Sequence, residues 1–279
     1  MMLYKNGLIV AATLALLAAC GGGGSSTEDN QQITSVQVRS LFYSRQAVLL
    51  VSGVYLRDSM SAATGICKDP VFNSAQSTPQ LAVLSCTVTA TGEQPLVITG
   101  TNGKQLYTTQ VTVPLPQVDL VTSQGSVLVE LDPVAAPLSV NNFLAYVNSG
   151  YYNNTLFHRV IPGFVAQGGG YLPGLIRKAG QRPPIVLESN KGLSNSRGTL
   201  AMARTNVPDS AASEFFINLV DNRGLDYQSD ASPGYAVFGK VVSGLEVIDA
   251  VATQPTQLSG GFRDVPVTDV VLQVAQQVK

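Results

Sequence analysis

The sequence predicts a mainly β protein with two different β domains. Residues 33–116 contain short runs of β-branched residues between turn residues and no long helical periodicity, which is typical of a small all-β sandwich. Residues 117–279 contain many short strand-like runs, two helical stretches and few connections long enough for parallel pairing. We therefore expect a closed antiparallel β-barrel with a helix over each end, preceded by a sandwich for which an immunoglobulin-like arrangement is one candidate.

Composition excludes several classes of function. The chain has 279 residues, of which 45% are hydrophobic, enough for a packed core. Its net charge is -1, so it lacks the basic character of nucleic-acid-binding proteins. One His and three dispersed Cys cannot supply a four-ligand zinc site. We expect no metal and no cofactor.

Residues 1–19 read as an export signal. Lys5 precedes an apolar run over 7–19, which is shorter than a membrane-spanning helix needs. The sequence Leu17-Ala18-Ala19-Cys20 resembles the lipobox of bacterial lipoproteins, in which the cysteine is lipidated and becomes the mature N-terminus. The alternative is an ordinary signal peptide with a cysteine nearby by chance.

Residues 20–32 would then be the lipidated Cys20 and a flexible linker. The linker is rich in Gly and Ser, and its twelve residues would span roughly 40 Å at full extension. Several acyl chains anchor a protein stably where one does not. Because lipoproteins with Gly after the cysteine usually go to the outer membrane, we expect an outer-membrane anchor facing the periplasm. The outer surface remains an alternative.

The front domain, residues 33–116, contains five strand-like runs. They are Val36–Val38, Ala47–Tyr55, Leu81–Ala90, Leu96–Thr99 and Tyr107–Val113. The domain is expected to end near Pro116, because prolines there disfavour helix and remove backbone donors. Its residues indicate no chemistry, so a spacer, a partner-docking module and a dimerisation surface all remain open.

Cys67 and Cys86 both lie in the front domain. Since Cys20 is expected to carry lipid, the other two form an even pair in an exported protein, which predicts a disulfide. Closing a loop of about 20 residues would stabilise the domain by roughly 3 kcal/mol. The alternative is two buried free thiols.

The second domain, residues 117–279, is expected to open with a hairpin, Val118–Val121 and Ser126–Leu131. A helix should follow from Pro137, a favoured first-turn residue, to a stop at Gly150. Apolar residues at helical spacing predict its buried face: Val140, Phe143, Leu144 and Val147.

The remainder of this domain reads as short strands and one more helix. Leu172–Leu193 is rich in loop residues, and Ser243–Glu246 has the spacing of a capping box, which predicts a short helix through Ala250. Further strands are expected at Leu200–Ala203, Phe215–Leu219, Tyr235–Val242 and Val267–Val274.

The stretch Phe157–Gly170 carries the candidate chemistry. Its first part is apolar and strand-like, holds Arg159 and the only histidine, His158, and ends at a Pro-Gly turn. Strand alternation would place these two side chains on opposite faces. Past the turn, Phe164 and Gln167 could join Arg159, giving a cation, an aromatic wall and an amide. Such a set can grip a peptide bond, but it contains no nucleophile.

Three blocks, in order, resemble the signatures of the cyclophilin family of peptidyl-prolyl cis-trans isomerases. They are Phe157–Gly170, Gly198–Arg204 followed by Ser213–Asn218, and Ala236–Val241. The resemblance covers about residues 118–279. It implies the barrel with two helices, isomerase (rotamase) activity, and proline-containing unfolded or exported polypeptides as partners.

The resemblance also implies roles for individual residues. Arg159 matches the catalytic arginine, and Gln167 matches the amide that holds the substrate backbone and orients that arginine. Phe164 and Phe216 match the aromatic floor of the proline pocket. The other substrate-binding positions are Val165, Met202, Ala203, Arg204, Glu214, Leu225 and Tyr235. A structural salt bridge is the alternative for Arg159, and general-base catalysis is the alternative for His158, which the family uses structurally.

Four positions depart from the family pattern. Val165 replaces the common Met, which slightly opens the pocket, and Arg204 stands where Asn is more usual. Glu214 replaces the common Gln; it could pair with Arg159 or Arg204, and capture of Arg159 would lower activity. Gly224 stands where some members have the Trp that favours tight cyclosporin binding, so we expect weak binding of cyclosporin.

Three functional hypotheses result. The first is a membrane-anchored isomerase that assists folding of exported proteins by Arg-assisted twisting of the X–Pro amide, without covalent chemistry. The second is a non-catalytic chaperone or scaffold that binds proline peptides, which only Glu214 favours. The third makes the front domain the functional part. The intact set of Arg159, Phe164, Gln167 and Phe216 favours the first.

Overall fold

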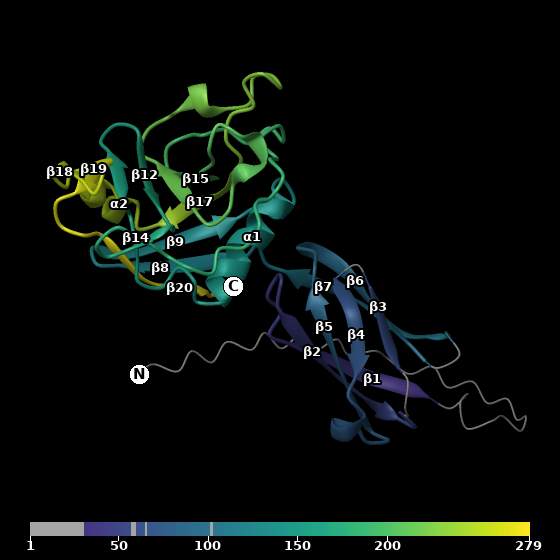
Figure 1. Ribbon diagram of the computed structural model, residues 1–279. Helices are drawn as coiled ribbons and strands as arrows, with labels where there is room; N and C mark the ends of the chain where they lie inside the picture. Colours follow the sequence, from purple (N-terminus) through teal and green to yellow (C-terminus); the bar gives the residue numbers. More distant parts are fainter. Residues whose placement is uncertain (1–30, 57–59, 65, 101–102) are drawn as a thin grey trace, which may run out of the picture. The chain divides into compact units, whose positions relative to one another are not determined.

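The computed structural model describes residues 31–56, 60–64, 66–100 and 103–279. Within this part the chain divides into two compact units, with the division between Pro114 and Leu115 (Figure 1). The expected signal peptide, the lipidated Cys20 and most of the linker lie outside the described residues. No helix in the described ranges is long and apolar enough to cross a membrane.

The first unit is a sandwich of two antiparallel sheets. One sheet has the order β1 (Gln32–Arg39), β2 (Gln46–Val54), β5 (Leu81–Val88), β4 (Cys67–Phe72). The other has the order β3 (Ser61–Thr64), β6 (Gly92–Thr99), β7 (Gln105–Val113). These two orders are those of an immunoglobulin constant-type domain, in which strands A, B, E and D form one sheet and C, F and G the other.

The core of this unit lies between the two sheets. Ala47, Leu49 and Val51 alternate along β2 with more exposed residues, and they join Leu96 and Ile98 of β6 in one buried cluster. This period of two is that of a strand with one face in the core. The sequence did not predict β3 or β4; in β4 every described residue is partly or fully exposed, so it carries no apolar alternation.

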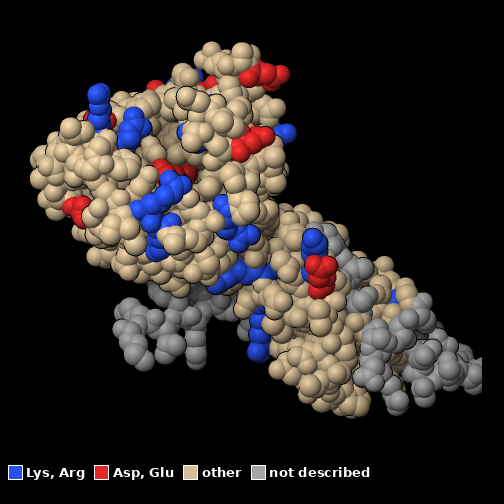
Figure 2. Space-filling view, viewed as in Figure 1, with Lys and Arg blue, Asp and Glu red and all other residues tan. Residues whose placement is uncertain are grey.

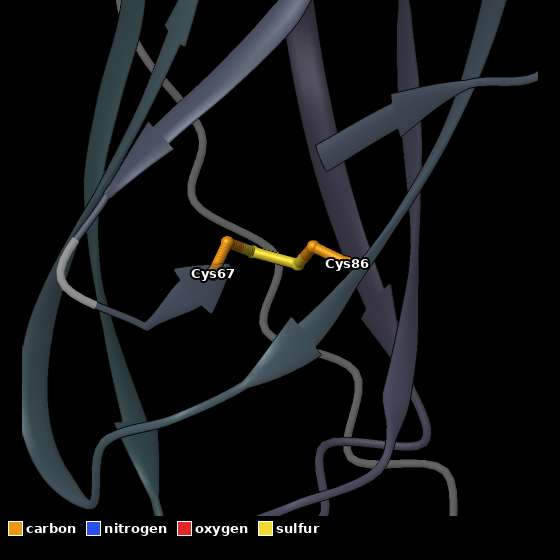
Figure 3. The surroundings of a disulfide bond; sticks show 2 residues. All are labelled: Cys67 and Cys86. Atoms are coloured by element: carbon orange, nitrogen blue, oxygen red, sulfur yellow. A yellow bond between two sulfur atoms is a disulfide. The ribbon is translucent and has the colours of Figure 1, made fainter. Parts of the chain in front are cut away.

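A disulfide joins Cys67, the first residue of β4, to Cys86 near the end of β5 (Figure 3). Their Cα atoms are 5.2 Å apart. The two strands are neighbours in one sheet, whereas the disulfide of antibody domains bridges the two sheets. Neither cysteine is therefore a free thiol.

The second unit is built on one curled antiparallel sheet of nine strands (Figure 1). The order is β10 (Thr155–Leu156), β20 (Val271–Gln277), β8 (Gln117–Thr122), β9 (Gly125–Leu131), β17 (Val237–Ser243), β15 (Thr199–Met202), β16 (Phe215–Asn218), β12 (Val165–Gly168), β11 (Arg159–Ile161). The two edge strands, β10 and β11, are separated only by Phe157 and His158. The chain itself thus brings the two edges of the sheet together. The predicted fold, a mainly β barrel with two helices, is confirmed.

Helix α1 (Pro137–Asn148) packs against β20 and β17. All four residues of its predicted apolar face are buried: Val140, Phe143, Leu144 and Val147. Gly150 follows the helix with φ +71°, a left-handed conformation that glycine adopts without strain and that ends the helix.

Helix α2 (Leu245–Ala252) packs against β9, β11 and β12. The predicted capping box is wrong. Ser243 is the last residue of β17, the residue before the helix is Gly244 with φ +85°, and no side chain caps the helix. The helix also continues past Ala250 to Ala252.

Two small hairpins complete the unit: β13 (Tyr171–Leu172) with β14 (Ile176–Arg177), and β18 (Thr256–Ser259) with β19 (Phe262–Pro266). The short 3₁₀ helices are η1 (Ser74–Gln76) in the first unit, and η2 (Pro208–Ser210) and η3 (Arg223–Leu225) in the second. The predicted final strand over 267–274 is misplaced. Residues 262–266 form the second strand of a hairpin, and the last strand begins at Val271.

Candidate active site

The β11–β12 hairpin places Arg159 beside Gln167. The two residues are directly paired across antiparallel strands, so their side chains lie on the same face. Between the strands, Gly163 adopts φ +71°, which lets the chain turn sharply after Pro162. Arg159 Nη1 donates a hydrogen bond to Gln167 Oε1 at 3.3 Å. A short local turn is thus sufficient to bring the cation and the amide together.

A cavity of about 190 Å³ opens beside this pair. Its lining includes all four residues predicted to be catalytic: Arg159, Phe164, Gln167 and Phe216. It also includes most of the predicted substrate-binding residues: Val165, Ala203, Arg204, Leu225 and Tyr235. The structure therefore gathers around one hollow residues of the first two signature blocks, together with Leu225 and Tyr235, which lie outside the blocks.

The floor of the cavity is apolar. Phe216 is 4% exposed, and its ring meets that of Tyr235 edge-on with centroids 5.6 Å apart. Val165 lines the same cavity and belongs to the same apolar cluster. Leu225 comes from η3, which is tied to this wall by a hydrogen bond from the Tyr235 N–H to the Leu225 carbonyl at 2.9 Å. An apolar, aromatic hollow of this kind suits a small ring such as that of proline.

Arg204 forms part of the wall through its own contacts. Its guanidinium lies over the ring of Tyr235, 4.7 Å from the centroid. Its Nε donates to the carbonyl of Gly234 at 2.9 Å, and its Nη1 donates to the carbonyl of Thr205 at 2.8 Å. These contacts hold the side chain flat against the pocket wall.

Two predicted site residues lie elsewhere. Met202 is 1% exposed, and the cavity lining does not include it, so this side chain belongs to the core. Glu214 lines a neighbouring cavity of about 160 Å³. The two cavities share Gln167, Ala203 and Arg204 as their common wall.

Glu214 pairs with neither arginine, so that expectation is wrong. Among the described residues, its carboxylate accepts a hydrogen bond from Gln167 Nε2 at 2.9 Å, and Oε2 lies 3.5 Å from His158 Nε2. Arg159 and Arg204 are held by other groups. The amide of Gln167 thus stands between the carboxylate and Arg159.

His158 lies next to the site but does not line the cavity. It is 3% exposed and packs on the ring of Tyr171 at 4.6 Å between centroids. Burial, first of all, lowers the pKa of His158 below its ordinary value; Glu214 opposes this effect and Arg159 reinforces it. The imidazole is therefore neutral at neutral pH. The predicted continuous strand is interrupted here, because β10 ends before Phe157 and β11 begins after His158.

Asp264 is a site residue that the sequence did not reveal. Its Oδ2 lies 4.0 Å from Arg159 Nε, so the guanidinium is near a carboxylate as well as the Gln167 amide. Asp264 sits in β19 with φ +60°, a left-handed conformation that Asp tolerates better than most residues. It lies 105 positions after Arg159, and no motif surrounds it, so nothing in the sequence pointed to it.

Comparisons with known proteins identify the family to which the second unit belongs. Residues 117–276 match the model of the family described as cyclophilin type peptidyl-prolyl cis-trans isomerase/CLD. The chain is 51% identical over 161 residues to peptidyl-prolyl cis-trans isomerase A of Dickeya dadantii, covering 57% of this chain and 83% of that protein. It is 47% identical over 154 residues to peptidyl-prolyl cis-trans isomerase B of Escherichia coli, covering 54% and 93%.

Among solved structures, a cyclophilin type peptidyl-prolyl cis-trans isomerase of Cryptosporidium parvum aligns over 59% of this chain and 98% of its own, with 27% identity and a TM-score of 0.49. The family match covers more than half of the chain. The chain belongs to the cyclophilin-type peptidyl-prolyl cis-trans isomerase family. Its activity is accordingly the cis-trans isomerisation of peptide bonds that precede proline.

Proposed function

We propose that this isomerase is anchored in the cell envelope, assists the folding of exported proteins, and uses Arg159 as its catalytic group. The observation that carries the catalytic part is the position of Arg159 in the lining of the cavity beside Phe164 and Phe216, with its guanidinium held by Gln167.

Rotation about the X–Pro bond is slow because it breaks amide resonance; the barrier is about 18–20 kcal/mol for a peptide bond. As the C–N bond twists, the proline nitrogen becomes pyramidal and regains a lone pair. A donor aimed at that nitrogen binds the twisted state better than either planar state, which lowers the barrier. Arg159 donates this hydrogen bond, while Phe164 and Phe216 hold the proline ring.

The twist moves no proton and forms no covalent bond. A nucleophile and a general base are therefore unnecessary, which agrees with a buried and neutral His158 beside the cavity rather than in it. Gln167 has two tasks, because its amide orients Arg159 and faces the path of the substrate backbone. The binding-only hypothesis loses its main support, since Glu214 does not capture Arg159.

The anchor is proposed from the N-terminal sequence. Cys20 would carry acyl chains, and the linker after it would let the folded units stand roughly 40 Å from the membrane when fully extended. We place the anchor in the outer membrane, facing the periplasm. Cys20→Ala should release the protein into the soluble periplasmic fraction and abolish incorporation of labelled palmitate. A variant that remains in the membrane fraction and still incorporates the label would contradict the anchor.

The substrates are proposed to be unfolded, proline-containing polypeptides without a common charge. Only 13% of the residues are charged, and the face drawn in Figure 2 is mostly uncharged, with both acidic and basic groups on it. Such a surface favours recognition through the pocket over long-range electrostatic attraction. Cyclosporin should bind weakly, because Gly224 leaves the edge of the pocket without a Trp.

The folding role is tested on a denatured secreted protein whose slow refolding phase is limited by a proline bond. Such phases take about 10–100 s, so acceleration is easy to follow. The wild type should shorten the phase in proportion to its concentration, and Arg159→Ala should not. A wild type that isomerises short peptides but leaves this phase unchanged would contradict the folding role while leaving the isomerase intact.

A further inference from the structure

Glu214, Gln167 and Arg159 form a chain of hydrogen bonds that ends at the pocket. Gln167 Nε2 donates to Glu214 Oε2 at 2.9 Å, and Gln167 Oε1 accepts from Arg159 Nη1 at 3.3 Å. Both the oxygen and the nitrogen of the Gln167 amide are thus hydrogen-bonded. Arg159 and Gln167 line the cavity, whereas Glu214 lines the neighbouring one and is linked to Arg159 through Gln167.

The chemistry of the three groups gives this chain one direction. A guanidinium only donates hydrogen bonds, and an ionised carboxylate only accepts them. Gln167 can satisfy both neighbours only with its oxygen toward Arg159 and its nitrogen toward Glu214. If residue 214 were Gln, its side chain could either donate or accept a hydrogen bond. It could then pair with the nitrogen or with the oxygen of the Gln167 amide, so it would not fix the orientation of that amide.

The position of the carboxylate is itself fixed by packing. A Cβ atom built on Gly170 would lie 2.7 Å from both Cγ and Oε1 of Glu214, so the side chain rests directly on this glycine. The Glu214 side chain is 21% exposed, and the neighbouring His158 side chain is 4% exposed. A charge-assisted hydrogen bond in such a partly buried place is stronger than one between neutral groups.

We propose that Glu214 is a positioning residue: it fixes the orientation of the Gln167 amide and, through it, the aim of the Arg159 guanidinium. This inference rests on the proposed catalytic role of Arg159. Glu214 lines the neighbouring cavity and its carboxylate bonds to Gln167 rather than to Arg159, so it acts on the arginine through Gln167. Glu214, in place of the Gln more common in the family, thereby restricts the orientations of Gln167 and Arg159.

The histidine beside Glu214 supplies a second readout. His158 Nε2 faces the same oxygen, Oε2, that Gln167 binds. The titratable or charged groups around the imidazole are Glu214, Arg159 and the phenol of Tyr171. Burial lowers the pKa of His158, so it becomes charged only on the acid side of its ordinary range. The imidazolium then competes with Gln167 for Oε2, and activity should fall as the pH decreases through that pKa.

The test uses the purified full chain and an Ala-Pro peptide, with exchange between cis and trans followed by NMR, which works without a protease and at acid pH. Glu214→Gln should lower kcat/KM about three- to tenfold, mainly through kcat. The reason is that a charge-assisted hydrogen bond to Gln167 is replaced by a weaker neutral one, in which either amide can be the donor. It should also flatten the acid limb of the pH profile. Glu246→Gln removes an equal charge from the exposed face of α2 and should change neither.

A double-mutant cycle separates positioning from other roles. In a Gln167→Ala background, Glu214→Gln should cause no further loss. Gly170→Ala crowds the unaltered carboxylate and should reproduce the loss of kcat, so the test does not depend on a single variant. Thermal unfolding of each variant checks that it is folded.

Two results would overturn the inference. The first is a Glu214→Gln variant whose kcat/KM is within twofold of the wild type and whose pH profile is unchanged. The second is a loss of activity on Glu214→Gln that is equally large in the wild-type and Gln167→Ala backgrounds. If these occur while Arg159→Ala is inactive, only the positioning role fails. An active Arg159→Ala variant would instead remove the proposed catalytic role on which this inference depends.

Discussion

Arg159 and Gln167 occupy paired positions on β11 and β12, and Arg159 Nη1 lies 3.3 Å from Gln167 Oε1. The two residues are eight positions apart in a hairpin whose turn is Pro162-Gly163. Because both belong to ladder strands, their backbones are fixed before any substrate binds. The relative position of the two residues is therefore a property of the sheet, not of a flexible loop.

Asp264→Asn should lower kcat/KM about two- to fivefold. The Asp264 and Arg159 side chains are 40% and 39% exposed, so solvent screens the pair and its loss costs little stability. Asn tolerates the left-handed backbone at this position, which keeps the β18–β19 hairpin intact. The effect is measured by NMR exchange on an Ala-Pro peptide. Asp269→Asn, at an exposed site in the same region, should behave as the wild type, and equal losses in the two variants would contradict a specific role for Asp264.

Phe164→Ala should raise KM for proline peptides about tenfold and lower kcat less. Phe164 lines the cavity and is only partly buried, so its loss removes contact area for the proline ring without a large cavity in the core. Peptide binding can be measured by titration under NMR. Phe42→Ala, at a partly buried aromatic residue of the first unit, is the control and should leave KM unchanged. An unchanged KM in Phe164→Ala would contradict the pocket assignment.

Replacing both Cys67 and Cys86 with Ala should destabilise the first unit by roughly 3 kcal/mol, since the disulfide closes a loop with a sequence separation of 19. Calorimetry of the full chain should show a lower unfolding temperature for that unit. The kcat/KM value should not change, because the residues lining the cavity all belong to the second unit. The reduced wild type should match the variant, whereas a variant as stable as the oxidised wild type would contradict the prediction.

Cyclosporin A should inhibit the wild type weakly, and Gly224→Trp should strengthen inhibition by about tenfold or more, in line with the energy that a buried Trp contributes at interfaces. A Cβ at Gly224 would meet no atom within 4 Å, so η3 has room for the new side chain. Dose–response curves on the Ala-Pro peptide give both values. Submicromolar inhibition of the wild type would contradict the first expectation.

The sequence predicted most of the pocket because its residues lie in compact motifs. Arg159, Phe164 and Gln167 fall within one strand–turn–strand block, so local chemistry and the family resemblance both pointed to them. Asp264 could not be predicted in this way, because only the packing of the β18–β19 hairpin beside β11 brings it to the guanidinium. The partner of Glu214 was also mistaken, since spacing does not show which donor lies nearest.

Local patterns failed where tertiary pairing overrides them. Ser243 has the spacing of a capping residue, yet its backbone is used by β17, so the helix begins after a left-handed Gly244. The continuous strand expected over 156–161 is interrupted at Phe157 and His158, because the chain crosses there from one edge strand of the sheet to the other. β4 escaped prediction because its side chains mostly face solvent. Strand pairing depends on distant residues that a sequence window does not contain.

The most direct test of the account is the isomerisation of an Ala-Pro peptide by the full chain and by Arg159→Ala, with Arg204→Ala as the matched control for loss of a nearby arginine. Without enzyme, exchange takes tens to hundreds of seconds. We predict clear catalysis by the wild type, a loss of about 10²–10³-fold in kcat/KM for Arg159→Ala, as for removal of one transition-state donor, and a much smaller loss for Arg204→Ala. A folded Arg159→Ala variant as active as the wild type would contradict the central claim.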